Sequence, residues 1–164
     1  MPKIFRLVKN GKLIEGVYEG ETLNTPSMFC VADALDSLMW IKEIGGLTET
    51  IRRSNENFKC LQSWVDKTPW IENLVSDPRN RSNTSVCLKF SDERLISLIP
   101  DEKTRFVKEF VALLEAENAA FDIKGHRNAP PGLRIWCGAT INLDDIQKLL
   151  PWLEYCFHEI ISSY

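Results

Sequence analysis

In the C-terminal half of the chain, the spacing of apolar residues changes repeatedly between two and three or four, and this alternation limits the folds available. Apolar residues alternate with polar ones at 86–90, 119–123 and 133–135, which predicts strands. They recur at steps of three and four at 106–114 and 146–160, which predicts amphipathic helices. The order β-α-β-β-α is typical of a small two-layer α/β sandwich, with helices packed on one side of a sheet.

The residues at the ends of these helices support the assignment. Asn118 follows the first helix as a possible cap, and Asn142 precedes the last helix, with carboxylates in its first turn. Pro151 lies inside the last apolar pattern, where proline removes a helical hydrogen bond and clashes with the preceding turn. We therefore expect a kinked helix or two short helices in the tail.

The first twenty residues predict a β-hairpin. Asn10 and Gly11 stand between two segments with strand-like composition, 4–8 and 12–18. Asn-Gly is a strong signal for a two-residue hairpin turn, because both turn positions require a positive φ. We expect the two segments to pair on either side of this turn.

Two helices are expected after the hairpin. Apolar residues at helical spacing predict a first helix over 28–44, which Gly45 and Gly46 end, and a second helix from 47 to 65. Prolines in the segment 66–82 indicate a loop.

Composition and charge exclude several classes of function. The chain has 164 residues, of which 44% are hydrophobic and 26% charged, as expected for one globular domain. A net charge of −3 argues against binding to nucleic-acid backbones or anionic membranes. No apolar run is long enough for a membrane span and no signal peptide is evident, so we expect a cytoplasmic protein.

The cysteines are scattered and lie in apolar segments. None forms a CxxC pair or has a histidine at zinc-ligand spacing, so no metal site is expected. This pattern is typical of reduced, buried thiols in a cytosolic protein. The five are Cys30, Cys60, Cys87, Cys137 and Cys156.

The stretch GHRNAPPGLRIW (125–136) concentrates positive charge on one stiff turn. Arg127 opens the turn and Arg134 lies on the strand that leaves it, on the face opposite the core-directed residues. Two guanidinium groups so placed can hold one anionic ligand, and His126 can donate a further hydrogen bond to it. The plainer interpretation, two surface arginines on a polar loop, is favoured by composition alone.

The stretch NTPS (24–27) is a second possible anion site. Thr25 is expected as the N-cap of the following helix, with Pro26 in its first turn. A helix N-terminus offers unpaired N–H groups to an anion, and the side chains of Asn24 and Thr25 add donors. An ordinary helix cap is the commoner reason for such a sequence.

Taken together, these stretches resemble one known family. GETLNTPSMFCVADALDSLMWIKEIGGL, followed downstream by GHRNAPPGLRIWCGAT and PWLEYCF, is similar to phosphoserine aminotransferases, a fold-type I family that uses pyridoxal 5'-phosphate. The resemblance covers essentially the whole chain but only the C-terminal part of the family. It implies that residues 1–50 correspond to the end of the large cofactor-binding domain and 51–164 to the small C-terminal domain. It also implies that the packing partners of the helix over 28–44 belong to the rest of the large domain, so the apolar side chains of this helix should be exposed.

The resemblance also implies roles for single residues. Asn24 and Thr25 match the pair that contacts the cofactor phosphate of the partner subunit in the family's homodimer. Arg134 matches the arginine that binds the substrate's α-carboxylate, and His126 and Arg127 match residues near the distal anion of phosphoserine or glutamate. None of the eleven lysines matches the one that forms the Schiff base, so the chain carries no catalytic residue of its own.

The reaction that the resemblance implies is transfer of an amino group between glutamate and 3-phosphohydroxypyruvate in serine biosynthesis. A related step of vitamin B6 synthesis, which some members catalyse, is left open. We expect the chain to be inactive alone and to work in a homodimer of longer chains or with a separate N-terminal half. The alternative is a non-catalytic anion-binding or interaction module that kept the small-domain fold.

Overall fold

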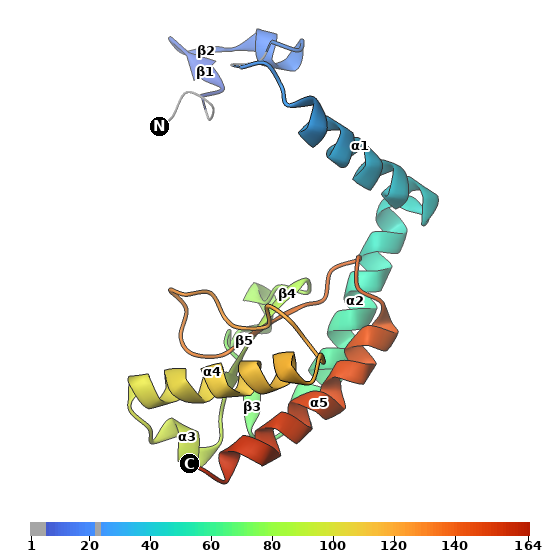
Figure 1. Cartoon of the computed structure of the whole chain (residues 1–164). Coiled ribbons are helices and arrows are strands. Elements are labelled where there is room, and N and C mark those ends of the chain that lie inside the picture. Colours follow the sequence, from blue (N-terminus) through green and yellow to red (C-terminus); the bar gives the residue numbers. More distant parts are fainter. Residues whose placement is uncertain (1–5, 22–23) are drawn as a thin grey trace. The chain divides into compact units, whose positions relative to one another are not determined.

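A computed structural model describes residues 6–21 and 24–164 of the chain (Figure 1). The chain divides into two compact units, Met1–Ile44 and Gly45–Tyr164. The boundary falls at Gly45, which has a φ of 116° and follows directly on the first helix. Each unit has its own architecture.

The first unit begins with the expected hairpin, in a shorter form. Strands β1 (Val8–Lys9) and β2 (Lys12–Leu13) pair antiparallel around Asn10 and Gly11, which have φ values of 52° and 76°. The turn prediction is therefore confirmed. The second segment does not stay extended to residue 18, because Glu15–Tyr18 forms a 3₁₀ helix. Residues 4 and 5 of the predicted hairpin lie outside the described residues.

Helix α1 (Met28–Glu43) completes the first unit and has no buried residue. Its N-cap is Ser27, whose Oγ accepts a hydrogen bond from the Cys30 amide at 3.4 Å. The prediction that Thr25 caps this helix is therefore wrong, because the chain enters the helix two residues later. The predicted exposure of its apolar side chains is confirmed for Met28, Phe29, Val31, Leu35, Leu38 and Met39.

The second unit is built on a three-stranded antiparallel sheet. β4 (Ser85–Phe90) lies between β3 (Ile71–Asn73) and β5 (Leu133–Trp136). Alternate residues of each strand are buried, so one face of the sheet carries the core and the other faces outward. The small mixed α/β fold expected for this region is confirmed.

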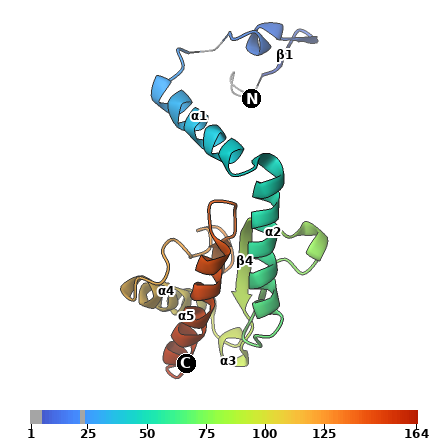
Figure 2. The ribbon, with the colours of Figure 1, turned by 90° about the vertical axis from the view of Figure 1, so that its right-hand side faces the viewer.

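Three helices cover the buried face of the sheet (Figures 1 and 2). They are α2 (Gly46–Val65), α4 (Pro100–Ala116) and α5 (Leu143–Ile161), and α5 packs against both of the others. A short helix, α3 (Glu93–Ile96), precedes α4. Asn118 follows α4 with a φ of 54°, and Asn142 caps α5, as the sequence indicates.

Aromatic side chains fill the centre of this core. The rings of Trp70 and Phe157 stack with centroids 4.1 Å apart, which joins the segment before β3 to helix α5. Phe90 meets Phe106 and Phe110 edge-on, with centroids 4.9 and 5.3 Å apart. Aromatic pairs in these geometries are worth about 0.5–1.5 kcal/mol beyond the area that they bury. The aromatic cluster thus holds the sheet and two helices together.

Three predictions about elements need correction. Residues 119–123 form no named strand, and only an isolated bridge pairs Lys124 with Leu133. The segment 66–82, expected to be a loop, instead supplies β3 as the third strand. α5 is one continuous helix that contains Pro151, so the alternative of two short helices is wrong, while the expected kink stays a prediction. Its proline lies on the exposed side, while Leu153 and Phe157 are buried.

The cysteines also differ from their predicted environment. All five are free thiols, but only Cys137 and Cys156 are buried, and Cys30 on α1 is exposed. Burial raises the pKa of Cys137 to about 12 and that of Cys156 to about 11. Both buried thiols are therefore protonated and unreactive near neutral pH.

Candidate functional site

The loop 125–132 is held at both ends. The Gly125 amide donates to the Gly132 carbonyl at 3.0 Å, and the Ala129 amide donates to the His126 carbonyl at 2.8 Å. Gly132 passes so close to β4 that an added Cβ would collide with the Leu88 carbonyl oxygen. Glycine is therefore required there. The expected closed turn is present, although its first arm is not a strand.

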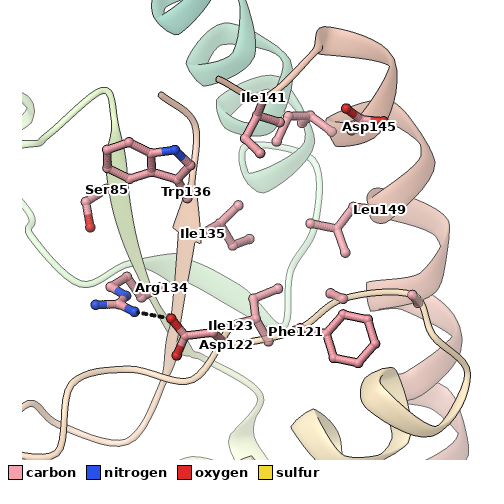
Figure 3. A pocket seen from close by; sticks show the side chains of 13 residues that line it. Ser85, Phe121, Asp122, Ile123, Arg134, Ile135, Trp136, Ile141, Asp145 and Leu149 are labelled. Carbon is pink, nitrogen blue, oxygen red and sulfur yellow. Dashed lines mark hydrogen bonds and ion pairs between the residues drawn. The ribbon is translucent and has the colours of Figure 1, made fainter. Parts of the chain in front are cut away.

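Arg134 projects from β5 on the outward face of the sheet. Its neighbours Leu133 and Ile135 are buried, while 38% of the Arg134 side chain is exposed. Its Nη2 donates to Oδ2 of Asp122 at 3.0 Å, the dashed line in Figure 3. The Arg134 amide also donates to the Ile123 carbonyl at 2.7 Å. Backbone and side chain of Arg134 are thus both tied to the segment before the loop.

A pocket of about 560 Å³ opens beside this ion pair. It lies between β5, the segment 119–123 and helix α5 (Figure 3). Phe121 and Leu149 contribute apolar walls, and Arg134 and Asp122 contribute charge at one side. The pocket is thus largely apolar with a few polar groups, as small-molecule sites commonly are.

His126 and Arg127 line a different hollow of about 170 Å³. The Nδ1 of His126 accepts a hydrogen bond from the Asn128 amide at 3.2 Å. Arg127 is exposed, and within residues 6–21 and 24–164 it forms no ion pair. Lys124 lines the same hollow. The structure therefore groups His126 with Arg127 and leaves Arg134 at a separate pocket of the same loop region.

Asn24 and Thr25 belong to the first unit and are exposed. They precede Ser27, which caps α1. Their side chains therefore do not close the helix terminus and are available for other contacts. An amide and a hydroxyl next to a helix N-terminus are donors that suit a phosphate oxygen.

Two residues at the larger pocket were missed by reasoning from sequence. Asp122, the ion-pair partner of Arg134, is a polar residue of the alternating stretch 119–123. This alternation was the sequence signal that could have placed Asp122 on the outward face with Arg134. Trp136 lies on the same outward face of β5 as Arg134, is half-exposed, and donates through Nε1 to Thr140 at 3.1 Å. The alternation in β5 placed Trp136 beside Arg134, but its role at the pocket did not follow from it.

In residues 6–21 and 24–164, no group of three histidine, cysteine or carboxylate residues is arranged to hold a metal ion. No helix in the same residues has the length and apolar character needed to cross a membrane.

Comparison of sequences shows which known proteins this chain resembles. Phosphoserine aminotransferases of Methanosarcina mazei and Methanosarcina barkeri are each 44% identical to it, over 96% of this chain and 40% of each relative. No family model matches. The chain is homologous to phosphoserine aminotransferases over part of their length. It spans about two fifths of the length of these relatives, which is consistent with a C-terminal portion.

Solved phosphoserine aminotransferases share the fold of this chain. The enzyme from Bacillus circulans subsp. alkalophilus superposes with a TM-score of 0.71 at 22% identity, over 87% of this chain and 36% of that one. A pyridoxal-phosphate-bound phosphoserine aminotransferase from Trichomonas vaginalis gives 0.68 at 22% identity, over 84% and 36%. The fold therefore matches that of phosphoserine aminotransferases over the part covered.

Proposed function

We propose that this chain is the substrate-binding portion of a phosphoserine aminotransferase, which transfers an amino group between glutamate and 3-phosphohydroxypyruvate. The observation that carries this proposal is the 44% identity, over 96% of the chain, to two enzymes with that name. In this proposal residues 1–50 belong to the large domain and 51–164 to the small domain. We assign the enzyme to the cytoplasm, where free thiols stay reduced.

Arg134 binds the α-carboxylate that glutamate and phosphoserine have in common. Its guanidinium stands at the edge of a pocket of about 560 Å³ and offers several N–H donors in one plane. An arginine–carboxylate pair of this kind contributes roughly 1.5–3 kcal/mol. His126 and Arg127 bind the distal phosphate or γ-carboxylate, and their exposed position in a shared hollow supports this role.

Asn24 and Thr25 hold the phosphate of pyridoxal phosphate, which would come from the partner subunit of a homodimer. Their exposed amide and hydroxyl groups ahead of α1 fit such a phosphate. When bound, the cofactor supplies an electron sink for the transfer. The resemblance matches none of the eleven lysines to the covalent anchor, so the residues of this chain bind and orient substrate and do not move its proton.

The chain alone is therefore inactive in this proposal. Transamination needs an amine within about 3 Å of the reacting atoms, in a pocket whose remaining walls come from the large domain. The alternative function is a non-catalytic anion-binding module. The compact, separate core of Gly45–Tyr164 favours that alternative, because such a unit can persist without the large domain.

A chimera tests the proposed function. The 164-residue chain replaces the matching 40% of the Methanosarcina mazei enzyme, and transamination is measured with glutamate and with phosphoserine. We expect activity in the chimera and none in the isolated chain. Arg134→Ala should raise the KM for both substrates by about tenfold or more, because each loses a charge-assisted hydrogen bond. Arg127→Ala should weaken binding of the distal phosphate of phosphoserine or the γ-carboxylate of glutamate.

Arg94→Ala is the matched control, because Arg94 is also an exposed arginine paired with an aspartate, Asp92. It should leave both KM values unchanged. Unaltered kinetics in Arg134→Ala would show that the assignment of the α-carboxylate is wrong. Turnover by the isolated chain would show that the catalytic amine lies within these residues after all.

A further inference from the structure

Arg134 is already engaged by a carboxylate of the chain itself. Its Nη2 lies 3.0 Å from Oδ2 of Asp122, and this is its one side-chain hydrogen bond among the residues that the structure describes. A guanidinium carries five N–H donors, so one contact leaves most of its donors unused. Arg134 therefore meets a carboxylate in the absence of any ligand, through a single oxygen.

The backbone fixes Asp122 in this position. The Arg134 amide donates to the Ile123 carbonyl at 2.7 Å, so the residue next to Asp122 is tied to β5. Asp122 has a φ of 52°, in the left-handed region that aspartate and asparagine tolerate better than most residues. Its side chain is 88% exposed. The carboxylate is thus held next to Arg134 while facing solvent at the mouth of the pocket (Figure 3).

Charge determines what this arrangement does to an incoming ligand. A carboxylate that approaches Arg134 must displace Asp122 or share the guanidinium with the Asp122 carboxylate. The Oδ2 of that carboxylate lies 3.0 Å from Nη2 of Arg134. Displacement costs the ion pair, and sharing costs like-charge repulsion. In either case the ligand carboxylate binds more weakly than it would to Arg134 alone.

We propose that Asp122 is a specificity-determining residue that competes with the substrate's α-carboxylate for Arg134. This inference rests on the proposed function, which assigns the α-carboxylate to Arg134. Asp122 therefore weakens binding of carboxylate ligands and leaves ligands without a carboxylate at this position unaffected. An exposed ion pair has a strength that corresponds to a change in affinity of roughly 1.5- to 5-fold.

The test uses the 164-residue chain and two ligands. O-phosphoserine carries phosphate, amine and α-carboxylate, and O-phosphoethanolamine lacks only the carboxylate. Binding is followed by NMR, through the side-chain N–H signals of Arg134 and the amide signals of the loop. In Asp122→Asn, which removes the charge and keeps a residue suited to a positive φ, phosphoserine should bind roughly 1.5- to 5-fold more tightly. Phosphoethanolamine should bind as before.

Two controls isolate the effect. Glu72→Gln removes the same charge from the same outward face of the sheet and breaks a different ion pair, with Lys89, so it should change neither affinity. The salt dependence of phosphoserine affinity is a second readout, because a purely structural role of Asp122 would not change with salt. At about 1 M salt, where the Debye length is about 3 Å, the difference between the wild-type chain and Asp122→Asn should shrink toward zero.

Arg134→Ala distinguishes failure of the Asp122 competition from failure of the proposed function. It should abolish the advantage of phosphoserine over phosphoethanolamine and make Asp122→Asn silent in the double variant. Unchanged or weaker phosphoserine binding in Asp122→Asn, with Arg134 still required, overturns the competition and leaves the proposed function standing. Binding in which Arg134 plays no part overturns both. No saturable binding in any variant overturns the competition in this chain and leaves the proposed function standing, because that function takes further pocket walls from the large domain.

Discussion

The two units of this chain use their apolar residues in opposite ways. In Gly45–Tyr164, residues from four helices and three strands enclose a common core, and Phe110 and Leu114 are fully buried. In α1 of the first unit, apolar residues recur at the same helical spacing but none is buried. Periodicity therefore predicts that a segment is helical, and it does not reveal whether the chain also contains the surface that buries it.

The largest expected difference between the units is in thiol reactivity. Cys30 on α1 is exposed, while Cys137 is fully buried with a pKa of about 12. Relative to a thiol with an ordinary pKa of 9.0, the thiolate fraction of Cys137 is lower by about three orders of magnitude near neutral pH. Labelling with an aromatic disulfide reagent at pH 8 should modify Cys30 rapidly and Cys137 slowly, and Cys30→Ser should remove the fastest phase. Rapid labelling of Cys137 would contradict the description of this core.

A matched pair of phenylalanine substitutions compares stability. Phe110→Ala should lower the free energy of unfolding by about 3–5 kcal/mol, because it leaves a cavity in a closed core. Phe29→Ala, at a side chain that is 79% exposed, should change it by no more than about 0.5 kcal/mol. Urea denaturation followed by tryptophan fluorescence measures both. Equal effects would mean that α1 is buried in solution.

Asn57 gives a smaller effect through hydrogen bonding. Its buried side-chain amide donates to the carbonyls of Cys137, Gly138 and Ile141, the last at 2.9 Å, and so fixes the loop after β5 to α2. Asn57→Ala removes this donor from the Cys137 and Ile141 carbonyls, while the Gly138 carbonyl keeps its bond from the Ile141 amide, and should cost about 1–3 kcal/mol. Asn24→Ala, at an exposed position in the first unit, serves as the control and should be neutral in the same denaturation experiment.

The smallest expected effect is on stability at acid pH, through Glu49 in α2. Hydrogen bonds from Arg52 and Arg53 lower the pKa of Glu49 from 4.5 to about 2. Because the folded-state pKa is depressed, this stabilisation is fully present above pH 4.5 and is lost as the pH falls toward 2. Glu49→Gln should therefore lose less stability between pH 6 and pH 3 than the wild-type chain. Glu43→Gln, in α1, should follow the wild type, and urea midpoints at the two pH values provide the comparison.

Much of this fold followed from local signals, and the exceptions have physical causes. Asn10-Gly11, Asn118 and Asn142 mark turns or caps through their own backbone preferences, so they could be found without tertiary information. β3 has only three residues, too few to show a period, and its pairing with β4 depends on a distant segment. Pro151 stays within α5, because packing overrides the local cost of proline.

The candidate site was predictable in part for the same reason. Arg134 could be assigned to the outward face, because the buried residues on either side of it define the pleat. Its partner Asp122 required knowledge of how the segment 119–123 lies against β5. The Arg134 amide bonds to the Ile123 carbonyl there, next to the isolated bridge between Lys124 and Leu133. The separation of His126 and Arg127 from the larger pocket likewise depends on the path of the loop.

The stack of Trp70 on Phe157 has a consequence for the time at which this unit can fold. The two rings lie 4.1 Å apart but belong to residues that the ribosome adds far apart in time. At a synthesis rate of about 5–20 residues per second, Trp70 is made roughly 4–17 s before Phe157. During that interval the sheet lacks α5, so the apolar surfaces of α2 and α4 have no cover. The nascent chain therefore exposes apolar surface of α2 and α4 until α5 has been made.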